Sequence, residues 1–363
     1  MQSRIFNFFG KFLLPILPFI LVFIAAIYQP NDLDLGWHLK YGEYFFQHGT
    51  ILKDNIFSTD MTDYKWPNTD WATDLITYAI FSKFGFLGLS FTGALVITLT
   101  FLFFSLAFKL SFWQKALIFP ILLVLEKTFN LVSFRGQLLS VMFLGVMVYL
   151  ITLFESGKRK ALFLLPALFL IWGNINGQFA LGLGVLGIWA FSHLLKVFVE
   201  KERRFSSIIG DIKFLSLVVV ATLIATLINP FGTEIYRIII VHFGDPQLKF
   251  IAEYLPFLEN SPEWWSHIVV GILIGFGGLF LYFSDKIKDY ISHLPGVVVL
   301  YGISFFVKRY VWSLYYLTIP FLKPVADFIK PDSEKMTKIV ASFIILIALG
   351  LIVLIKDPAW VFA

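Results

Sequence analysis

The amino-acid sequence predicts an all-α fold, a polytopic bundle of transmembrane helices with about 11 spans. Three observations predict it. Hydrophobic residues make up 58% of the 363 residues and charged residues only 15%, with a mean hydropathy of +0.81, whereas soluble domains carry roughly 25% charged residues. Apolar runs close to the length that crosses a bilayer recur along the chain. Basic residues gather in the short intervals between these runs, as they do on the cytoplasmic side of membrane proteins.

We expect a single integral membrane domain over residues 1–363. The first apolar run is long, contains Pro15 and Pro18, and has no clear small-residue cleavage site, which indicates a membrane anchor rather than a cleaved signal. The expected spans are residues 12–28, 86–108, 112–126, 138–154, 161–173, 178–198, 212–229, 266–283, 294–307, 311–328 and 338–355.

The distribution of Lys and Arg predicts the orientation of the bundle. With a cytoplasmic N-terminus, 18 of the 29 basic residues fall on the inner side, although the outer intervals are longer. The polar intervals 29–85 and 229–265 then form the first and second extracytoplasmic loops. The net charge of +5 reflects this topology and does not indicate nucleic-acid binding. The absence of cysteine excludes disulfides and thiol catalysis.

The first loop is a long polar interval in a very apolar chain. Residues 31–74 carry eight acidic side chains and three basic ones. A loop net charge of about −5 beside a span is typical of the outer side, and the concentration of carboxylates in this loop indicates a functional site. Within the loop, Trp37, Tyr41, Tyr44 and Phe45 recur at helical spacing. This pattern predicts an amphipathic helix on the membrane surface.

The acidic residues of this loop allow several interpretations. Asp32 and Asp34 stand where the helix begins, and free backbone N–H groups stabilise negative charge there. In one interpretation an aspartate is the general base for an acceptor hydroxyl. In another, Asp34 and His38, four residues apart, ligate a divalent ion. The structural alternative is a helix cap with a surface Asp–His pair. Asp70 and Asp74 either complete a carboxylate cluster or belong to a solvated loop with a cap at Asp74.

Basic residues stand at the outer ends of other spans. Arg135, Lys308 and Arg309 either bind a lipid phosphate or extend to the headgroups. Glu253 and Tyr254 lie in the second loop, from which they could reach the first.

Amide side chains interrupt the apolar sequence at Asn174 and Asn176. At membrane depth such groups must hydrogen-bond, so they either brace a tight helical hairpin or line a cavity. The segment 229–232, Asn-Pro-Phe-Gly, predicts a turn after the seventh span.

With these residues in view, the chain resembles the GT-C class of membrane glycosyltransferases, enzymes similar to the dolichyl-phosphate-mannose protein mannosyltransferases and their bacterial relatives. The relatives often carry Arg-Pro-Gln where this chain has Arg135-Gly136-Gln137, and a histidine where it has Asn176. The resemblance covers residues 10–325 through DLDLGWHLKYG (32–42), DNIFST (54–59), WPNTDW (66–71), SFRGQLLS (133–140), LFLIWGNINGQF (168–179), INPFG (228–232), AEYLP (252–256) and the KR pair (308–309).

This resemblance implies that the protein transfers a sugar. The donor would be a polyprenyl-phosphate-linked sugar, the transfer would be inverting, and the catalytic acid would be Asp32 or Asp34. Arg135 and Arg309 would contact the donor phosphate. Further substrate-binding positions would be His38, Gln137, Asn174, Asn176, Glu253 and Lys308.

The resemblance also implies the setting of the reaction. The acceptor would be a glycan, a lipid or a protein, and the metal, if one is used, Mg²⁺ or Mn²⁺. The expected location is the plasma membrane of a bacterium, among membrane lipids, with the active site outside. The alternative function is a transporter or flippase for a lipid-linked saccharide, which would use the same charged groups to bind a headgroup.

Overall fold

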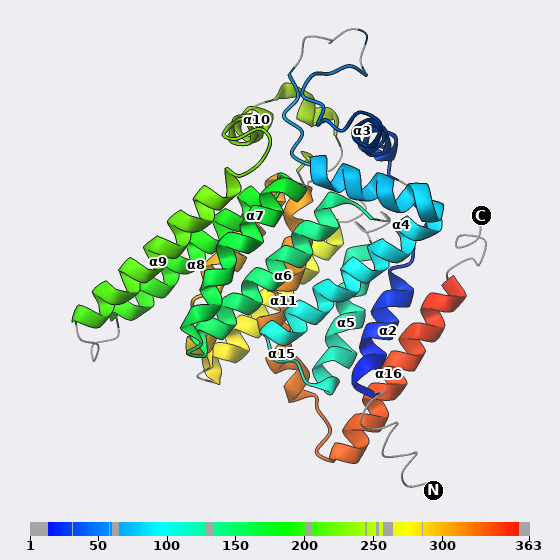
Figure 1. Cartoon of the computed structure of the whole chain (residues 1–363). Helices are drawn as coiled ribbons and strands as arrows, with labels where there is room; N and C mark the ends of the chain where they lie inside the picture. Colours follow the sequence, from blue (N-terminus) through cyan, green and yellow to red (C-terminus); the bar gives the residue numbers. More distant parts are fainter. Residues whose placement is uncertain are drawn as a thin grey trace, which may run out of the picture.

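The computed structural model describes residues 14–30, 32–57, 59, 65–127, 134–199, 205–243, 245–251, 254–256, 264–284 and 286–355. Across these ranges the chain is almost entirely helical (Figure 1). The strand-like pairing within them is one isolated antiparallel bridge between Asp54 and Lys65.

The helices follow one another along the chain as a bundle. In chain order they are α2 (Leu14–Ala25), α3 (Leu35–His48), α4 (Trp71–Ala107), α5 (Phe112–Lys127), α6 (Gly136–Glu155), η2 (Arg159–Leu164), α7 (Leu165–Ile175), α8 (Phe179–Val199), α9 (Phe205–Thr226), α10 (Glu234–Phe243), η3 (Pro246–Phe250), α11 (Trp264–Phe283), α12 (Ile287–Tyr290), α13 (Leu294–Phe306), η5 (Lys308–Tyr310), α14 (Val311–Leu317), α15 (Ile319–Phe328) and α16 (Glu334–Ile355).

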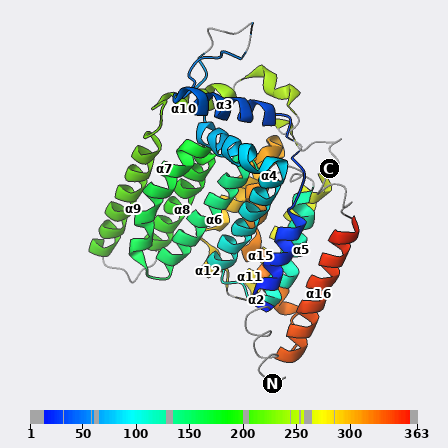
Figure 2. The same cartoon turned by 45° about the vertical axis from the view of Figure 1, so that its right-hand side comes forward.

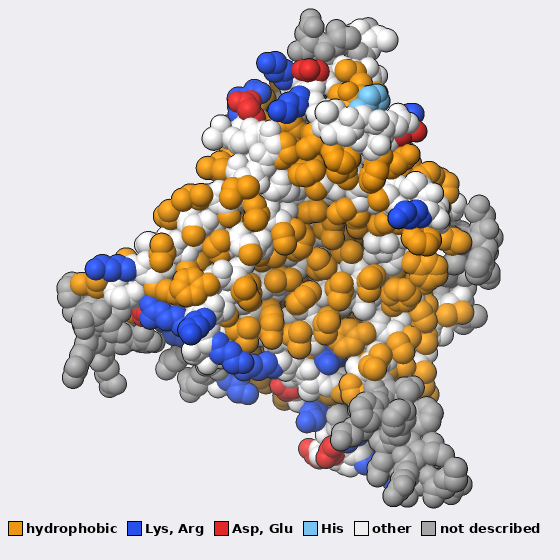
Figure 3. Space-filling view, viewed as in Figure 1, with side chains coloured by type: hydrophobic (Ala, Val, Ile, Leu, Met, Phe, Trp, Pro, Cys, Tyr) orange, Lys and Arg blue, Asp and Glu red, His pale blue; other side chains and the backbone are white. Residues whose placement is uncertain are grey.

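Six of the described helices are long and apolar enough to cross a membrane, namely α4, α6, α8, α9, α11 and α16. Helices α2, α5 and α13 are apolar but shorter. Figure 3 shows hydrophobic side chains across the middle of the face in view, with Lys and Arg side chains along its lower edge. The all-α class and the membrane prediction are therefore confirmed, while the count of eleven spans stays a prediction.

Most expected spans coincide with one helix, and two differ in detail. The span expected at 161–173 is the 3₁₀ segment η2 followed by α7, and the one expected at 311–328 is divided into α14 and α15. A proline stands in the first turn of both α7 and α15. Because proline has no N–H group, it is best accommodated where a helix begins, and a new helix starts there.

Helix α4 is bent at Gly85, and the bend changes the expected first loop. Gly85 has φ 60° and ψ −154°, a backbone conformation open almost only to glycine. The expected span begins just after this residue, but the helix itself begins at Trp71. In Figure 1 the first part of α4 lies across the end of the bundle and the second part descends through it. The interval 29–85 is therefore largely helical, and the interval 229–265 likewise contains α10 and η3.

Helix α3 is the surface helix that the aromatic spacing predicts. It runs from Leu35 to His48 and ends at Gly49, whose φ of 68° is the left-handed conformation of a helix C-terminus. Figures 1 and 2 both show α3 lying across the same end of the bundle, above the first part of α4; we call this the α3 end. Gly42 permits close packing, since an added Cβ would lie 2.3 Å from Tyr78 Cβ and 2.5 Å from the Asp74 carbonyl oxygen.

The rigid support beneath this end is the main hydrophobic core. It contains fully buried aromatic side chains from α4, α5, α7 and α14, among them Phe104, Phe119, Phe169 and Tyr315. Every residue of α14 is buried. A second, smaller core joins α2, α5 and α16. Packing at this density holds the helix ends in fixed positions, which is what a precise polar site at those ends requires.

Candidate functional site

Two aspartates of the first loop and one arginine from the start of α6 form an ion-paired cluster at the α3 end. Arg135 Nε lies 3.1 Å from Asp32 Oδ2, and Arg135 Nη2 donates a hydrogen bond to Asp34 Oδ2 over 3.0 Å. The side chains of Asp32, Arg135 and Asp34 are 5%, 15% and 58% exposed. The structure thus brings both predicted catalytic acids to the predicted phosphate-binding cation, more than 100 residues away in sequence.

The local sequence explains how the two aspartates share one arginine. Asp32 Oδ1 accepts the backbone N–H of Asp34 over 3.0 Å, which closes an Asx-type turn before α3. Asp34 occupies the N-cap position of α3 but makes no side-chain capping bond. Its carboxylate is directed to Arg135 instead. The helix-cap interpretation of Asp34 is therefore wrong in this respect.

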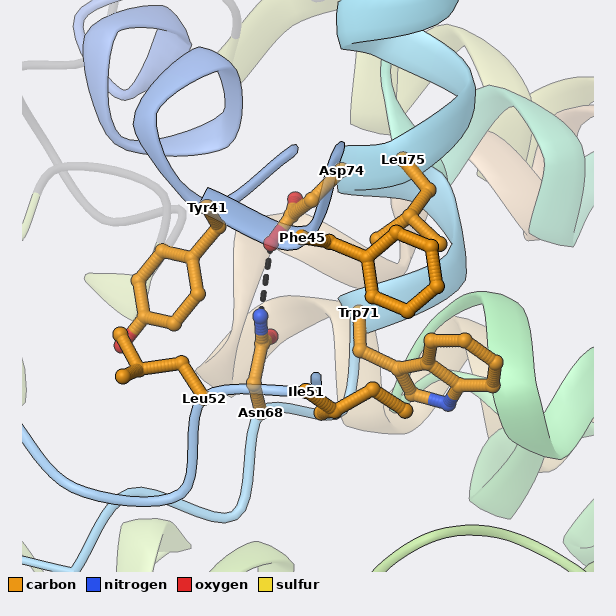
Figure 4. A pocket seen from close by; sticks show the side chains of 8 residues that line it. All are labelled: Tyr41, Phe45, Ile51, Leu52, Asn68, Trp71, Asp74 and Leu75. Atoms are coloured by element: carbon orange, nitrogen blue, oxygen red, sulfur yellow. Dashed lines mark hydrogen bonds between the residues drawn. The ribbon is translucent and has the colours of Figure 1, made fainter. Parts of the chain in front are cut away.

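A second polar cluster joins α3 to the first turn of α4. His38 Nδ1 lies 2.5 Å from Asp74 Oδ1, and Asn68 Nδ2 donates to Asp74 Oδ2 over 2.6 Å. Asp74 is only 2% exposed, and the His38 side chain is 16% exposed. Figure 4 shows Asp74 and Asn68 joined by their hydrogen bond, with Tyr41 and Trp71 among the side chains around them. Both carboxylate oxygens of Asp74 are thus held.

The electrostatics of this cluster favour a charged imidazole. Burial of His38 acts against its charged form, but the hydrogen bond and negative charge of Asp74, with smaller contributions from Asp70 and Asp32, raise the pKa of His38 to about 9. The nearby Tyr41 behaves differently. Burial, with the charge of Asp74, raises the pKa of the Tyr41 phenol to about 12, so this group is neutral at physiological pH.

A third set of hydrogen bonds fixes Asp70 at the start of α4. Asn176 Nδ2 lies 3.1 Å from both oxygens of the Asp70 carboxylate. Asn176 Oδ1 in turn accepts from Ser140 Oγ over 3.0 Å, and Ser140 accepts the Trp172 indole N–H over 2.9 Å. Because Asn176 is 2% exposed, this chain of bonds satisfies buried polar groups and ties α4 to α6 and α7.

The two positions where the sequence departs from the motifs it resembles lie against each other. A Cβ on Gly136 would approach Asn176 Nδ2 to 2.9 Å. A larger residue at position 136 would therefore push Asn176 away from Asp70. Asn174 has a bracing role: it accepts from the Trp71 indole over 3.1 Å and donates to the Ile228 carbonyl over 2.8 Å.

Two of the remaining predicted residues, Lys308 and Arg309, contact the second loop. Arg309 Nη1 donates to the Tyr254 hydroxyl over 2.7 Å and its guanidinium lies over the Tyr254 ring, 5.1 Å from the centroid. The backbone N–H of Lys308 donates to the Leu255 carbonyl over 3.4 Å. This pairing joins η5 to the second loop. Glu253 lies outside the described residues.

Gln137, the third residue of the arginine motif, is part of the support below the ion-paired cluster. It is 2% exposed, and its Oε1 atom is buried without a hydrogen-bond partner among the described residues. It follows Gly136 at the start of α6, so the predicted binding position is near Arg135 in the chain but is covered by protein.

The predicted Asp34–His38 metal pair is not formed. Asp34 is paired with Arg135 and His38 with Asp74. Within the described part of the chain, no group of three or more His, Asp or Glu side chains is placed to hold a metal ion. Among the described residues, the side chains at this end do not fit Mg²⁺ or Mn²⁺, which prefer several oxygen ligands without a competing cation. No catalytic step is therefore assigned to a metal.

Sequence reasoning left out the partner that organises the buried cluster. The sequence indicates that Asp70 and Asp74 either complete a carboxylate cluster or lie in a solvated loop. The contact between His38 and Asp74 joins residues 36 apart and has no local sequence signature. The helix begins at Trp71, well before the span expected at 86, and this start places Asp74 in the first turn of α4. Asp74 is neither a cap nor solvated.

Comparison with protein-family models, curated proteins and solved structures gives no match to this chain. What the fold and the site define is the class: an all-α integral membrane protein with a cluster of carboxylates, an arginine and a histidine at one end of its bundle.

Proposed function

We propose that the protein is a membrane glycosyltransferase of the GT-C type, which moves a sugar from a polyprenyl-phosphate donor to an acceptor hydroxyl. One observation carries this proposal. The sequence motifs single out two acids and one cation for opposite roles, and the Asp32 and Asp34 carboxylates each lie within 3.1 Å of the Arg135 guanidinium at the end of the bundle. An arginine beside carboxylates can bind a phosphate while an aspartate orients a hydroxyl.

The exposure of the two aspartates assigns them different roles in this proposal. Asp34 is 58% exposed and uses one oxygen on Arg135, so its other oxygen is available to an acceptor hydroxyl. Asp32 is 5% exposed, and its carboxylate pairs with the Nε atom of Arg135. Asp34 is therefore the general base, and Asp32 positions the guanidinium.

The reaction follows from this division. The acceptor oxygen forms a bond to the anomeric carbon, while the bond from that carbon to the phosphate oxygen breaks and its electrons leave with the phosphate. The hydroxyl proton passes to Asp34. Arg135 stabilises the charge that develops on the phosphate. Because the nucleophile and the leaving group occupy opposite faces of the sugar, the anomeric configuration is inverted.

The proposed topology places this chemistry outside the cell. In the space-filling view, basic side chains line the end of the bundle opposite α3 (Figure 3), which by the positive-inside rule is the cytoplasmic end. The α3 end is then extracytoplasmic, with eleven spans between the two sides and a bacterial plasma membrane as the expected location. Lipid-linked donors present their headgroups at that level of the bilayer.

The experiment is an assay of sugar transfer by the purified protein in lipid nanodiscs. Wild type is compared with Asp34→Asn and with Asp54→Asn, an exposed acid of the same loop that bridges Lys65 through its backbone. The proposal expects an inverted product from wild type and from Asp54→Asn, and at least a hundredfold loss in Asp34→Asn. Equal transfer by the two variants contradicts the role of Asp34. If no donor is consumed although lipid-linked saccharide binds, the flippase alternative is favoured.

A further inference from the structure

The charges around α3 leave few donors for a phosphate. The four aspartates at positions 32, 34, 70 and 74 carry negative charge into this region, and among the described side chains Arg135 and His38 are the cations paired with three of them. Arg135 is already engaged by two carboxylates. A lipid phosphate that relied on Arg135 alone would meet a neutralised cation beside further negative charge. A second positive donor is required.

His38 has the geometry of that donor. Its Nδ1 atom is fixed by Asp74, whose second oxygen is fixed by Asn68. The Nε2 atom, on the opposite side of the ring, makes no hydrogen bond to any residue in the described ranges. The ring is 16% exposed. A buried carboxylate therefore fixes one ring nitrogen, and the second has no protein partner in these ranges, an arrangement also found in catalytic Asp–His pairs.

We propose that His38 contacts the donor phosphate, with its Nε2–H group donating a hydrogen bond to the oxygen that leaves the anomeric carbon, and that Asp74 is the residue that positions it. This inference rests on the proposed function and specifies the site's ligand: a phosphate monoester or diester on a lipid. Two observations point the same way. His38 lies one helical turn from Asp34 on α3, and Asp32, the partner of Arg135, is close enough to influence the His38 charge.

The chemistry needs no additional reactant. When the anomeric carbon–oxygen bond breaks, the phosphate changes from a diester with about one negative charge to a monoester with up to two. The hydrogen bond from Nε2–H stabilises that added charge, and the proton stays on His38. The raised pKa of His38, about 9, is consistent with a ring that carries both N–H groups at neutral pH. The acceptor proton still passes to Asp34.

The test measures lipid binding rather than turnover. Purified full-length protein in nanodiscs is titrated with a polyprenyl phosphate and with the matching uncharged polyprenol. The variants are His38→Gln, Asp74→Asn and the control His48→Gln, an exposed histidine of the same helix whose Nδ1 bonds the Tyr44 carbonyl. We expect about a tenfold weaker Kd for polyprenyl phosphate in His38→Gln and Asp74→Asn. Polyprenol binding, and all binding by His48→Gln, should be unchanged.

A second measurement keeps the proposal testable if a variant does not fold. In wild-type protein labelled with nitrogen isotope at histidine, polyprenyl phosphate should shift the Nε2 resonance of one histidine, and polyprenol should not. The proposal is overturned if His38→Gln binds polyprenyl phosphate as tightly as His48→Gln, or if no histidine resonance responds.

These outcomes separate the inference from the proposed function. Loss of polyprenyl-phosphate binding in His38→Gln, with no sugar transfer by wild type from any donor, supports the phosphate contact and contradicts the transferase. Sugar transfer that is intact in His38→Gln contradicts the contact alone.

Discussion

The sharpest structural prediction concerns Gly42, because one added methyl group should separate α3 from α4. In Gly42→Ala the new Cβ would lie 2.3 Å from Tyr78 Cβ and 2.5 Å from the Asp74 carbonyl oxygen, whereas ordinary contacts begin at 3.4 Å. Helix α3 must therefore move by about 1 Å. Overpacking of this kind costs about 1–3 kcal/mol. That outweighs the gain of about 1 kcal/mol from replacing glycine by alanine inside a helix.

The same displacement should weaken the site. His38 lies one turn before Gly42 on α3 and Asp74 is part of the backbone that α3 would clash with. A shift of about 1 Å lengthens the His38–Asp74 contact beyond hydrogen-bonding distance, and misplacement on this scale can lower a catalytic rate by about 10²-fold.

Gly36→Ala provides the control. Gly36 belongs to the same helix, and an added Cβ there has no atom within 4 Å. Thermal unfolding in detergent, followed by circular dichroism, should show a lower midpoint for Gly42→Ala and an equal or slightly higher one for Gly36→Ala. Equal midpoints for the two variants would refute the close-packing argument.

Three further predictions follow from the buried polar groups. Arg135→Gln should lower the free energy of unfolding by about 3 kcal/mol, because it leaves the Asp32 carboxylate buried without its partner. In denaturant titrations, adding Asp32→Asn to this variant should recover much of the lost free energy. The absence of any recovery would contradict a buried ion pair. Because the pKa of His38 is raised from 6.5 to about 9, its charged form stabilises the folded state fully below pH 6.5, and this stabilisation is lost as the pH rises through about 9. The difference in unfolding midpoint between wild type and His38→Gln should therefore shrink from neutral to alkaline pH. A difference that does not change with pH would contradict this prediction. Asn176→Ala should cost about 2 kcal/mol, and Asn176→Asp more, since it sets a second carboxylate against Asp70; equal midpoints would show that the two side chains do not interact.

The sequence is informative where the bilayer imposes the pattern. Apolar runs locate most helices to within a few residues, but α4 and α9 begin well before the spans expected at 86 and 212. Gly85 lies at the expected beginning of the second span because the chain turns into the membrane there. The helical spacing of Trp37, Tyr41 and Phe45 predicts α3 for the same reason, since a surface helix must separate its apolar and polar sides.

The site is only partly readable in sequence. The sequence indicates which residues form the site but not how they pair. The partners of Asp34, His38 and Asp74 are determined by the packing of α3, α4 and α6. Spacing of four residues made Asp34 and His38 natural partners. Tertiary contacts that bury Asp74 and extend Arg135 toward the first loop took precedence.

Sugar transfer is tested most directly by the release of radiolabelled sugar from a panel of polyprenyl-phosphate donors by purified protein in nanodiscs. Wild type should consume one donor in the presence of its acceptor, and the Asp32→Asn/Asp34→Asn double variant should consume none while keeping its helical circular-dichroism spectrum. Turnover by the double variant at the wild-type rate would contradict the proposed sugar transfer, and so would tight donor binding by wild type without any release of sugar.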